Sequence, residues 1–201
     1  MEGVYKRIWK EAKEYYKKGR PMDIEHIKWM MKIAGKICQK ENFDESILIP
    51  LVILHDVGYA KVNNLEEIKY FDVDIRKAHM KAGEEIADLI LKSIKYRKDK
   101  TKKIIKYVGI HDNWAFGEVE IYEKDKMLGT FKDLDYLWPY TRIGFESIKK
   151  HLKKNDQEMW KSLNDEKSPI YNKKEFSTIF TKELREKYLK RLKRYLRIDE
   201  G

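Results

Sequence analysis

The segment "ILIPLVILHDVGYA", residues 47–60, contains the most apolar run of the chain, and it determines how the fold is interpreted. The uncharged run leads directly into His55 and Asp56, in a chain of which 39% of the residues are charged. Because the run is apolar on all sides, we predict that it forms a buried central helix. A buried parallel strand is the alternative, but such strands occur in sets and the sequence contains no second run of this kind.

Apolar residues recur at helical spacing through most of the chain, which has only four prolines and ten glycines. We therefore predict an all-α fold, a single bundle-like domain over residues 1–201 that ends in a long amphipathic helix. Residues 59–74 are expected to be irregular, and residues 115–130 to form either a loop or a short hairpin. The predicted helices cover residues 2–18, 23–41, 44–58, 75–94, 99–114, 131–138, 140–154 and 173–200.

Residues that are typical of helix ends predict where the second helix begins and where the third begins and ends. Asp23 is expected to be the N-cap of the second helix, and Asp44 or Ser46 that of the third. Pro50 is expected in the first turn of the third helix, and Gly58 at its C-terminal end.

The charge balance favours anionic partners. The chain has 44 lysines and arginines against 34 acidic residues, a net charge of +10. Such an excess is compatible with nucleotides, nucleic acid or phosphorylated metabolites as partners, although a solvated surface is the simpler explanation of lysines interleaved with acids. A single cysteine, Cys38, excludes an internal disulfide. Together with the absence of a long apolar segment and of a signal peptide, this predicts a cytoplasmic protein without membrane association.

Six polar residues lie on or beside the apolar stripes of different predicted helices. Burying an unpaired imidazole or carboxylate is costly, so inward polar groups on separate helices are best explained by their convergence. A metal ion is the simplest common partner, because neutral imidazoles and carboxylates are usual metal ligands. Any one of these histidines alone would more often be a hydrogen-bonded core or surface residue, so the argument rests on the set. Its members are His26, His55, Asp56, His79, His111 and Asp135.

The order of these residues resembles the HD-domain superfamily of metal-dependent phosphohydrolases over about residues 20–145. The resemblance is carried by "DIEHIKWMMKIA", "LVILHDVGY", "HMKAGEEIADLIL", "IIKYVGIHDNW" and "FKDLDYLW". It implies an all-α HD-type domain followed by a C-terminal helical extension over residues 146–201. In the last segment, Asp135, two residues before Leu137, matches the family's final ligand better than Asp133.

The resemblance also implies a ligand set. One divalent ion would be held by His26, His55, Asp56 and Asp135. His79 and His111 match positions that bind a second metal in some branches and contact substrate phosphate in others. With both present, a site for two ions is favoured, and Mn, Fe, Co, Ni, Zn and Mg remain open.

The implied function is hydrolysis of a phosphorylated small molecule, with a nucleotide as the expected substrate, by metal-activated water. Asp56 and Asp112 are the candidate catalytic residues. Asp112 is expected to orient His111 or accept a proton, with a surface helix cap as the alternative. The candidate substrate cations are Lys61, Arg76 and Arg142, each with a solvated surface charge as the alternative.

Departures from better-known branches limit the assignment. The acidic pair of the alarmone hydrolases is missing after His55 and Asp56, and so are the double histidine and Gly-Tyr-Pro of the cyclic-di-GMP phosphodiesterases. Monoester and diester hydrolysis are therefore both open, and the oligomeric state is not predicted.

Two other functions remain open. The same six residues resemble the di-iron oxygenases of this superfamily, in which the metals activate oxygen instead of water. The basic segment "KELREKYLKRLKRYLR", residues 182–197, is also compatible with a non-enzymatic nucleic-acid-binding module. Its apolar stripe is explained more simply by a helix that packs on the core.

Overall fold

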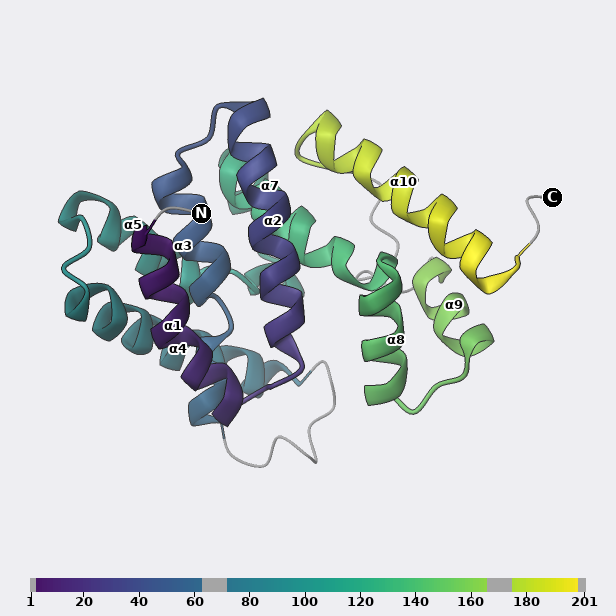
Figure 1. Cartoon of the computed structure of the whole chain (residues 1–201), viewed down its shortest axis with the longest axis horizontal. Helices are drawn as coiled ribbons and strands as arrows, with labels where there is room; N and C mark the ends of the chain where they lie inside the picture. Colours follow the sequence, from purple (N-terminus) through teal and green to yellow (C-terminus); the bar gives the residue numbers. More distant parts are fainter. Residues whose placement is uncertain (1–2, 63–71, 166–174, 199–201) are drawn as a thin grey trace. The chain divides into compact units, whose positions relative to one another are not determined.

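The computed structural model describes residues 3–62, 72–165 and 175–198 (Figure 1). These residues form ten α-helices and three short 3-10 helices without a β-strand, which confirms the all-α prediction. None of the described helices has the length and apolar character of a membrane span. The chain divides into two compact units, residues 1–120 and 121–201, which we describe separately. The prediction of one domain over the whole chain stays a prediction.

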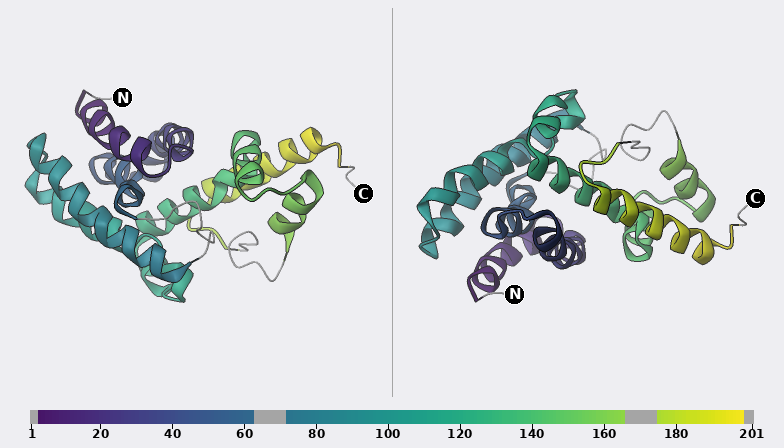
Figure 2. Two further views of the ribbon diagram at one scale, coloured as in Figure 1. Left: turned by 90° about the horizontal axis from the view of Figure 1, so that it is seen from below. Right: turned by 90° about the horizontal axis from the view of Figure 1, so that it is seen from above.

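The first unit is built from five α-helices and two 3-10 helices. α3 is its central helix and contacts α1, α2 and α5, while α4 and α5 lie side by side (Figure 2). Its elements are α1 (Gly3–Lys18), α2 (Asp23–Glu41), α3 (Glu45–Leu54), η1 (Val57–Lys61), α4 (Val73–Ser93), α5 (Lys98–Ile110) and η2 (Asn113–Phe116).

α3 is buried along almost its whole length, as its uniform apolarity predicts: every residue from Ile47 to Leu54 is buried. The N-cap is Asp44, whose side chain accepts a hydrogen bond from Ser46 N at 3.0 Å. The strand alternative is therefore wrong.

Pro50 lies in the second turn of α3, not in the first as predicted. A proline there cannot donate to the carbonyl four residues earlier, which belongs to Ser46. The hydroxyl of Tyr96 donates to that carbonyl at 2.8 Å and replaces the missing bond. A distant tyrosine thus makes an interior proline tolerable, which local sequence patterns do not reveal.

Two further boundary predictions are wrong because tertiary contacts override local signals. Asp23 lies in the first turn of α2, whose N-cap is Met22, and its carboxylate pairs with Arg20 Nε at 3.1 Å. α3 ends at Leu54 rather than at Gly58, which lies inside η1. A Cβ on Gly58 would lie 1.8 Å from His79 O, so the glycine permits close contact between η1 and α4.

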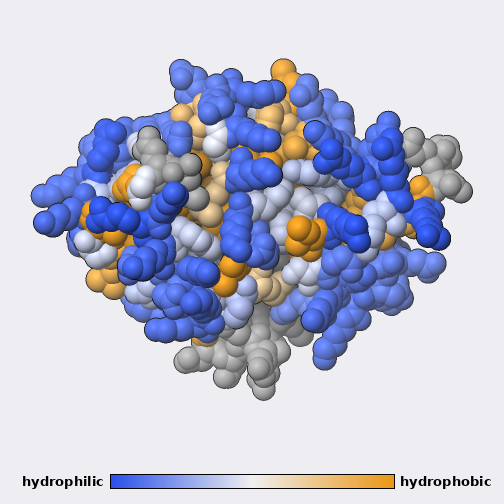
Figure 3. All heavy atoms as spheres, in the orientation of Figure 1, coloured by the Kyte–Doolittle hydropathy of each residue, from blue (hydrophilic) through white to orange (hydrophobic). Residues whose placement is uncertain are grey.

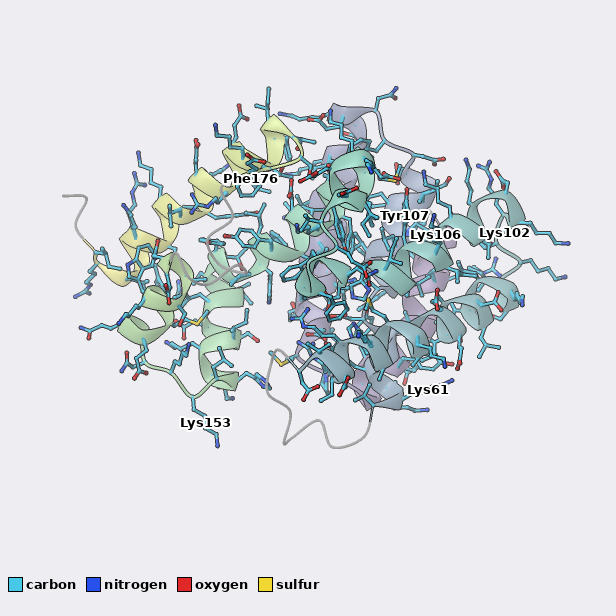
Figure 4. All side chains as sticks on the ribbon, turned by 180° about the vertical axis from the view of Figure 1, so that it is seen from behind. Lys61, Lys102, Lys106, Tyr107, Lys153 and Phe176 are labelled. Carbon is cyan, nitrogen blue, oxygen red and sulfur yellow. The ribbon has the colours of Figure 1, made fainter. Side chains whose placement is uncertain are left out.

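α5 shows the amphipathic pattern expected of a helix on the edge of the unit. Ile104, Tyr107 and Val108 are buried, whereas Lys102 and Lys106 are exposed and extend away from the helix (Figure 4). Much of the face of the molecule seen in Figure 3 is hydrophilic, in keeping with the high content of charged residues.

The second unit contains α7 (Lys126–Leu137), η3 (Trp138–Tyr140), α8 (Arg142–His151), α9 (Asp156–Asn164) and α10 (Ile179–Leu196), and the short α6 (Glu120–Lys124) leads into it. The loop or hairpin predicted for residues 115–130 is replaced by η2, α6 and the start of α7. Asp125 separates α6 from α7, because its side chain caps α7 by accepting from Met127 N and Leu128 N. α9 was not predicted, and it begins with a capping box formed by Asn155 and Glu158.

α10 is shorter than the predicted helix over residues 173–200, because it begins after Thr178, which caps it, and ends at Leu196. Of the predicted apolar stripe only Leu192 is buried, and Tyr195 is exposed. The helix also exposes Lys187, Lys190, Arg191 and Arg194. A nucleic-acid-binding role for this surface stays a prediction.

We expect Gly58→Ala to destabilise the protein by about 3 kcal/mol, because the added methyl group would overlap the backbone of His79 and Gly83. Gly35→Ala is the matched control, since a Cβ at Gly35 has no atom within 4 Å. Gly35 lies inside α2, so Gly35→Ala should raise the free energy of unfolding by about 0.5 to 1 kcal/mol. Urea unfolding measures both changes, and equal effects at the two glycines would contradict this account.

Candidate metal site

The first unit brings together one aspartate and four histidines, all of them buried. His55 directly follows the last residue of α3, and Asp56 leads from it into η1. His79 lies inside α4, His111 directly follows α5, and His26 lies in the first turn of α2. His55 and His79 are completely shielded from solvent, and Asp56 is 9% exposed.

Three of these residues form a tight cluster. Asp56 Oδ1 lies 3.2 Å from His111 Nε2 and 3.4 Å from His79 Nε2. The two Nε2 atoms of His79 and His111 are 3.2 Å apart. His55 Nε2 lies 3.5 Å from the other carboxylate oxygen of Asp56. The ring of His26 lies 5.9 Å from that of His55, centroid to centroid.

In His55, His79 and His111 the other ring nitrogen, Nδ1, is directed at a backbone carbonyl. A carbonyl oxygen only accepts, so Nδ1 must carry the proton in these contacts, and in the neutral ring Nε2 is then an acceptor. Second contacts of this kind are typical of histidines that bind metals. The Nδ1–O distances are 3.0 Å from His55 to Val52, 3.3 Å from His79 to Ile75, and 2.7 Å from His111 to Val108.

This arrangement fits a cation. His79 Nε2, His111 Nε2 and an oxygen of Asp56 are all acceptors, and acceptors this close repel one another unless positive charge lies among them. A proton can bridge one such pair, whereas a divalent ion would accept electron pairs from all three. Their ligand atoms lie within 4.8 Å of one another, as a shared metal ion requires. Mixed nitrogen and oxygen donors suit ions such as Mn, Fe, Co, Ni and Zn.

The surroundings set the protonation of these groups. Burial lowers the pKa of His26 to about 3 and also lowers the pKa of His79, so both rings are neutral at pH 7, as ligands must be. Burial alone would raise the pKa of Asp56, but His55 and His111 outweigh it and hold that pKa well below its usual value. For His111 burial is outweighed by Asp112 and Asp56, which raise its pKa.

The His-Asp dipeptide occurs twice with the same local geometry. His55 and His111 each follow the end of a helix and direct Nδ1 to the carbonyl three residues earlier. The aspartates that follow have φ and ψ of −101° and 7° at Asp56, and of −106° and 6° at Asp112. A 3-10 helix follows each aspartate. The repeated "HD" in "HDVGYA" and "HDNWAF" is the sequence signal from which this repeat could have been predicted.

Asp112 and Arg76 form a buried ion pair beside the cluster. Arg76 Nη1 donates to Asp112 Oδ2 at 2.5 Å, and the same oxygen lies 3.8 Å from His79 Nε2. Burial would raise the pKa of Asp112, but His111 and Arg76 outweigh it and lower that pKa. Asp112 makes no side-chain capping bond, so the surface-cap alternative is wrong.

Three other predicted site residues are Lys61, Arg142 and Asp135. Lys61, labelled in Figure 4, is exposed and pairs with Glu85 at 2.8 Å. Arg142 and Asp135 belong to the second unit, where Arg142 is exposed and stacks over Tyr195 at 4.2 Å. The roles of these three residues in binding substrate or metal stay predictions.

Asp133, the alternative to Asp135 in the same segment, forms hydrogen bonds inside the second unit. Its Oδ2 accepts hydrogen bonds from Ser177 N at 2.7 Å and from Thr181 Oγ1 at 2.8 Å. The carboxylate thereby holds the start of α10, which accounts for its complete burial.

Tyr59, which was not predicted as a site residue, lies against the cluster, and Arg20 lies behind it. The ring of Tyr59 stacks on that of His79, and Arg20 lies over Tyr59. The position of Tyr59 just after the His-Asp dipeptide, in "HDVGY", is a signal in the sequence, whereas nothing local indicates Arg20.

Comparison with protein families matches residues 23–174, about three quarters of the chain, to the HD domain. This match confirms the resemblance carried by the histidines and aspartates. No curated protein and no solved structure matches the chain.

The lowered pKa of His26 predicts a pH-dependent stability for the metal-free protein. Unfolded, His26 takes up a proton below its usual pKa of 6.5, whereas folded it stays neutral down to about pH 3. The unfolded state binds more protons in this window, so stability falls as the pH falls. At pH 5 this shift in the pKa of His26 lowers the free energy of unfolding by about 2 kcal/mol.

Urea unfolding at pH 7 and pH 5, with a chelator present, measures this contribution. His26→Gln should reduce the loss of stability between the two pH values by about that amount. His151→Gln, at an exposed histidine, is the control and should behave like wild type. An identical pH dependence in His26→Gln and wild type would contradict a buried neutral ring.

Proposed function

Since the chain belongs to the HD-domain family, we propose that it is a metal-dependent phosphohydrolase that acts on a phosphorylated small molecule, with a nucleotide as the substrate class. The observation that carries the proposal is the buried convergence of Asp56, His79 and His111, with both imidazole Nε2 atoms directed at one carboxylate. Such a donor set needs a cation, and hydrolysis of phosphate esters is the chemistry that the family most often performs with one.

The residues that would hold metal come from four helices of the first unit. The proposed ligands of this unit are His26, His55, Asp56, His79 and His111. Asp135 of the second unit is proposed as a further ligand. This number of donors supports two ions. When bound, a divalent ion lowers the pKa of a water molecule toward neutrality and polarises a phosphoryl oxygen.

The protein itself orients the ligands. Backbone carbonyls of Val52, Ile75 and Val108 accept the Nδ1 protons and keep each Nε2 directed inward. Burial excludes competing water, and the lowered pKa of Asp56 keeps its carboxylate ionised at neutral pH. The fold alone thus orients the ligands, keeps His26 and His79 neutral and keeps Asp56 ionised, whereas the raised pKa of His111 means that metal binding competes with a proton at that ring.

Arg76 is the cation best placed to bind a substrate phosphate. A planar guanidinium with five N–H donors matches the geometry of phosphate oxygens. Asp112 holds it next to His79, and the guanidinium carbon lies 5.4 Å from the ring centroid of Trp114. Because the pKa of Asp112 is lowered, we favour a positioning role for this carboxylate over proton transfer. The half-buried Trp114 supports a substrate with a planar ring, such as a nucleobase.

A substrate panel tests the proposed function. Metal-stripped protein is reloaded with Mn, Co, Ni or Mg, and phosphate release is measured with nucleotides and phosphomonoesters. We expect metal-dependent turnover that falls at least about a hundredfold in His55→Ala, because that variant removes a ligand. His151→Ala is the control and should match wild type. No turnover by the wild type with any metal, or full turnover by His55→Ala, would overturn the proposal.

The same preparation distinguishes the di-iron oxygenase alternative. Protein purified without added metal is analysed for iron, for a visible absorption band and for oxygen consumption. Colourless protein loaded with Mn or Zn supports the hydrolase. Iron with an absorption band and substrate-dependent oxygen uptake would instead establish the oxygenase.

We expect Arg76→Lys to lower kcat/KM about ten- to a hundredfold while leaving the metal content unchanged, because lysine keeps the charge but loses the planar fork. Arg97→Lys is the matched control. Arg97 also pairs with an aspartate, Asp99, at 2.9 Å, but on the exposed surface. An unchanged kcat/KM in Arg76→Lys would exclude Arg76 as the phosphate ligand.

A further inference from the structure

One candidate ligand, His79, lies in a stack of side chains that extends away from the metal site. The ring of Tyr59 lies nearly parallel to the imidazole of His79, with centroids 4.1 Å apart and an angle of 6° between the planes. The guanidinium carbon of Arg20 lies 4.4 Å from the centroid of Tyr59. One ring face cannot hold both groups at these distances, so His79 and Arg20 occupy opposite faces of Tyr59.

Two layers of the stack, Arg20 and Tyr59, are held in place by their surroundings. Arg20 is held by the buried Asp23, which its Nε contacts at 3.1 Å. The backbone of Tyr59 is enclosed by two glycines. A Cβ on Gly19 would lie 2.6 Å from Tyr59 C, and a Cβ on Gly58 would lie 1.8 Å from His79 O. Tyr59 is therefore wedged between the end of α1 and the side of α4 and has little room to shift.

Tyr59 stacks on the histidine whose hydrogen bond to the backbone is the longest of the three. The Nδ1 contact of His79 is 3.3 Å long, compared with 3.0 Å for His55 and 2.7 Å for His111. At that length the carbonyl of Ile75 selects which nitrogen faces the backbone but restrains the tilt of the ring weakly. A parallel aromatic ring restrains the tilt directly. The two contacts together define the direction of Nε2.

We propose that Tyr59, backed by Arg20, is a positioning residue that holds His79 in the orientation needed to bind metal. The inference rests on the proposed metal site and adds a requirement for a planar ring at residue 59. The phenol hydroxyl has no part in it. Ring stacking against a ligand thus replaces the short hydrogen bonds that orient the other two histidines.

Co²⁺ binding to metal-stripped protein tests the proposal. Titrations followed by visible absorption and calorimetry yield the number of sites and the Kd of each. His79→Ala identifies the site that depends on His79. Tyr59→Phe keeps the ring and should bind Co²⁺ at this site like wild type. Tyr59→Leu should raise the Kd for Co²⁺ at this site about ten- to a hundredfold, the usual effect of removing a group that orients a metal ligand.

Two further variants separate positioning from general destabilisation. Tyr5→Leu removes another buried tyrosine from the same unit, one that lines a pocket with Trp9 and Met31 rather than with the candidate ligands. It should lower the Tm and leave the Kd for Co²⁺ unchanged. Arg20→Met removes only the outer layer of the stack and should raise the Kd several-fold. If Tyr59→Leu does not fold, the Kd of Arg20→Met for Co²⁺ tests the proposal in its place.

The outcomes are distinguishable from failure of the proposed function. An unchanged Kd in Tyr59→Leu or, if that variant is unfolded, in Arg20→Met overturns the positioning role, and so does a Kd raised equally in Tyr59→Phe and Tyr59→Leu. The positioning role is also overturned if His79→Ala keeps every Co²⁺ site of the wild type. In each of these cases the hydrolase proposal stands if wild type binds Co²⁺ and turns over substrate. Wild type that binds no Co²⁺ overturns both.

Discussion

The candidate site depends on one recurring interaction, the hydrogen bond from a histidine Nδ1 to a backbone carbonyl at or near the end of a helix. At the end of α3, His55 binds the carbonyl of Val52, and the hydroxyl of Tyr16 donates to the next carbonyl, that of Ile53, at 2.9 Å. Carbonyls in the last turn of a helix lack partners within the helix, so these side chains complete it. The same bond that ends the helix directs Nε2 toward the neighbouring ligands.

Close packing of short segments then brings the ligands together. η1 can approach α4 because residue 58 is glycine, and this contact places Asp56 against His79. α5 packs beside α4 and delivers His111 to the same point. The apolar body of α3, buried on all sides, anchors the first part of this arrangement. Hydrophobic burial thus provides the rigidity that a cluster of mutually repelling acceptors requires.

Two arginine–aspartate pairs, of which Arg20–Asp23 is half-buried and Arg76–Asp112 is buried, flank the cluster and have different consequences. Arg20, held by Asp23, lies behind Tyr59 and is separated from the ligands by that ring. Arg76 is linked to His79 through Asp112, since Asp112 Oδ2 contacts both Arg76 Nη1 and His79 Nε2. The first arginine is therefore suited to supporting a ligand, and the second to meeting an anionic group of the substrate.

The sequence by itself determined the helical class and the polar residues that converge within the first unit, because periodicity and the cost of burying polar groups are local properties of each segment. The helix at residues 47–54, its Asp44 cap and the burial of His26, His55, His79 and His111 follow from them. Tertiary structure alone decided the end of α3, the roles of Asp23 and Gly58, and the stack on His79. Each of these depends on an approach between residues distant in sequence, such as Tyr96 to Ser46 or Tyr59 to His79, and hydrophobic periodicity carries no information about such distances.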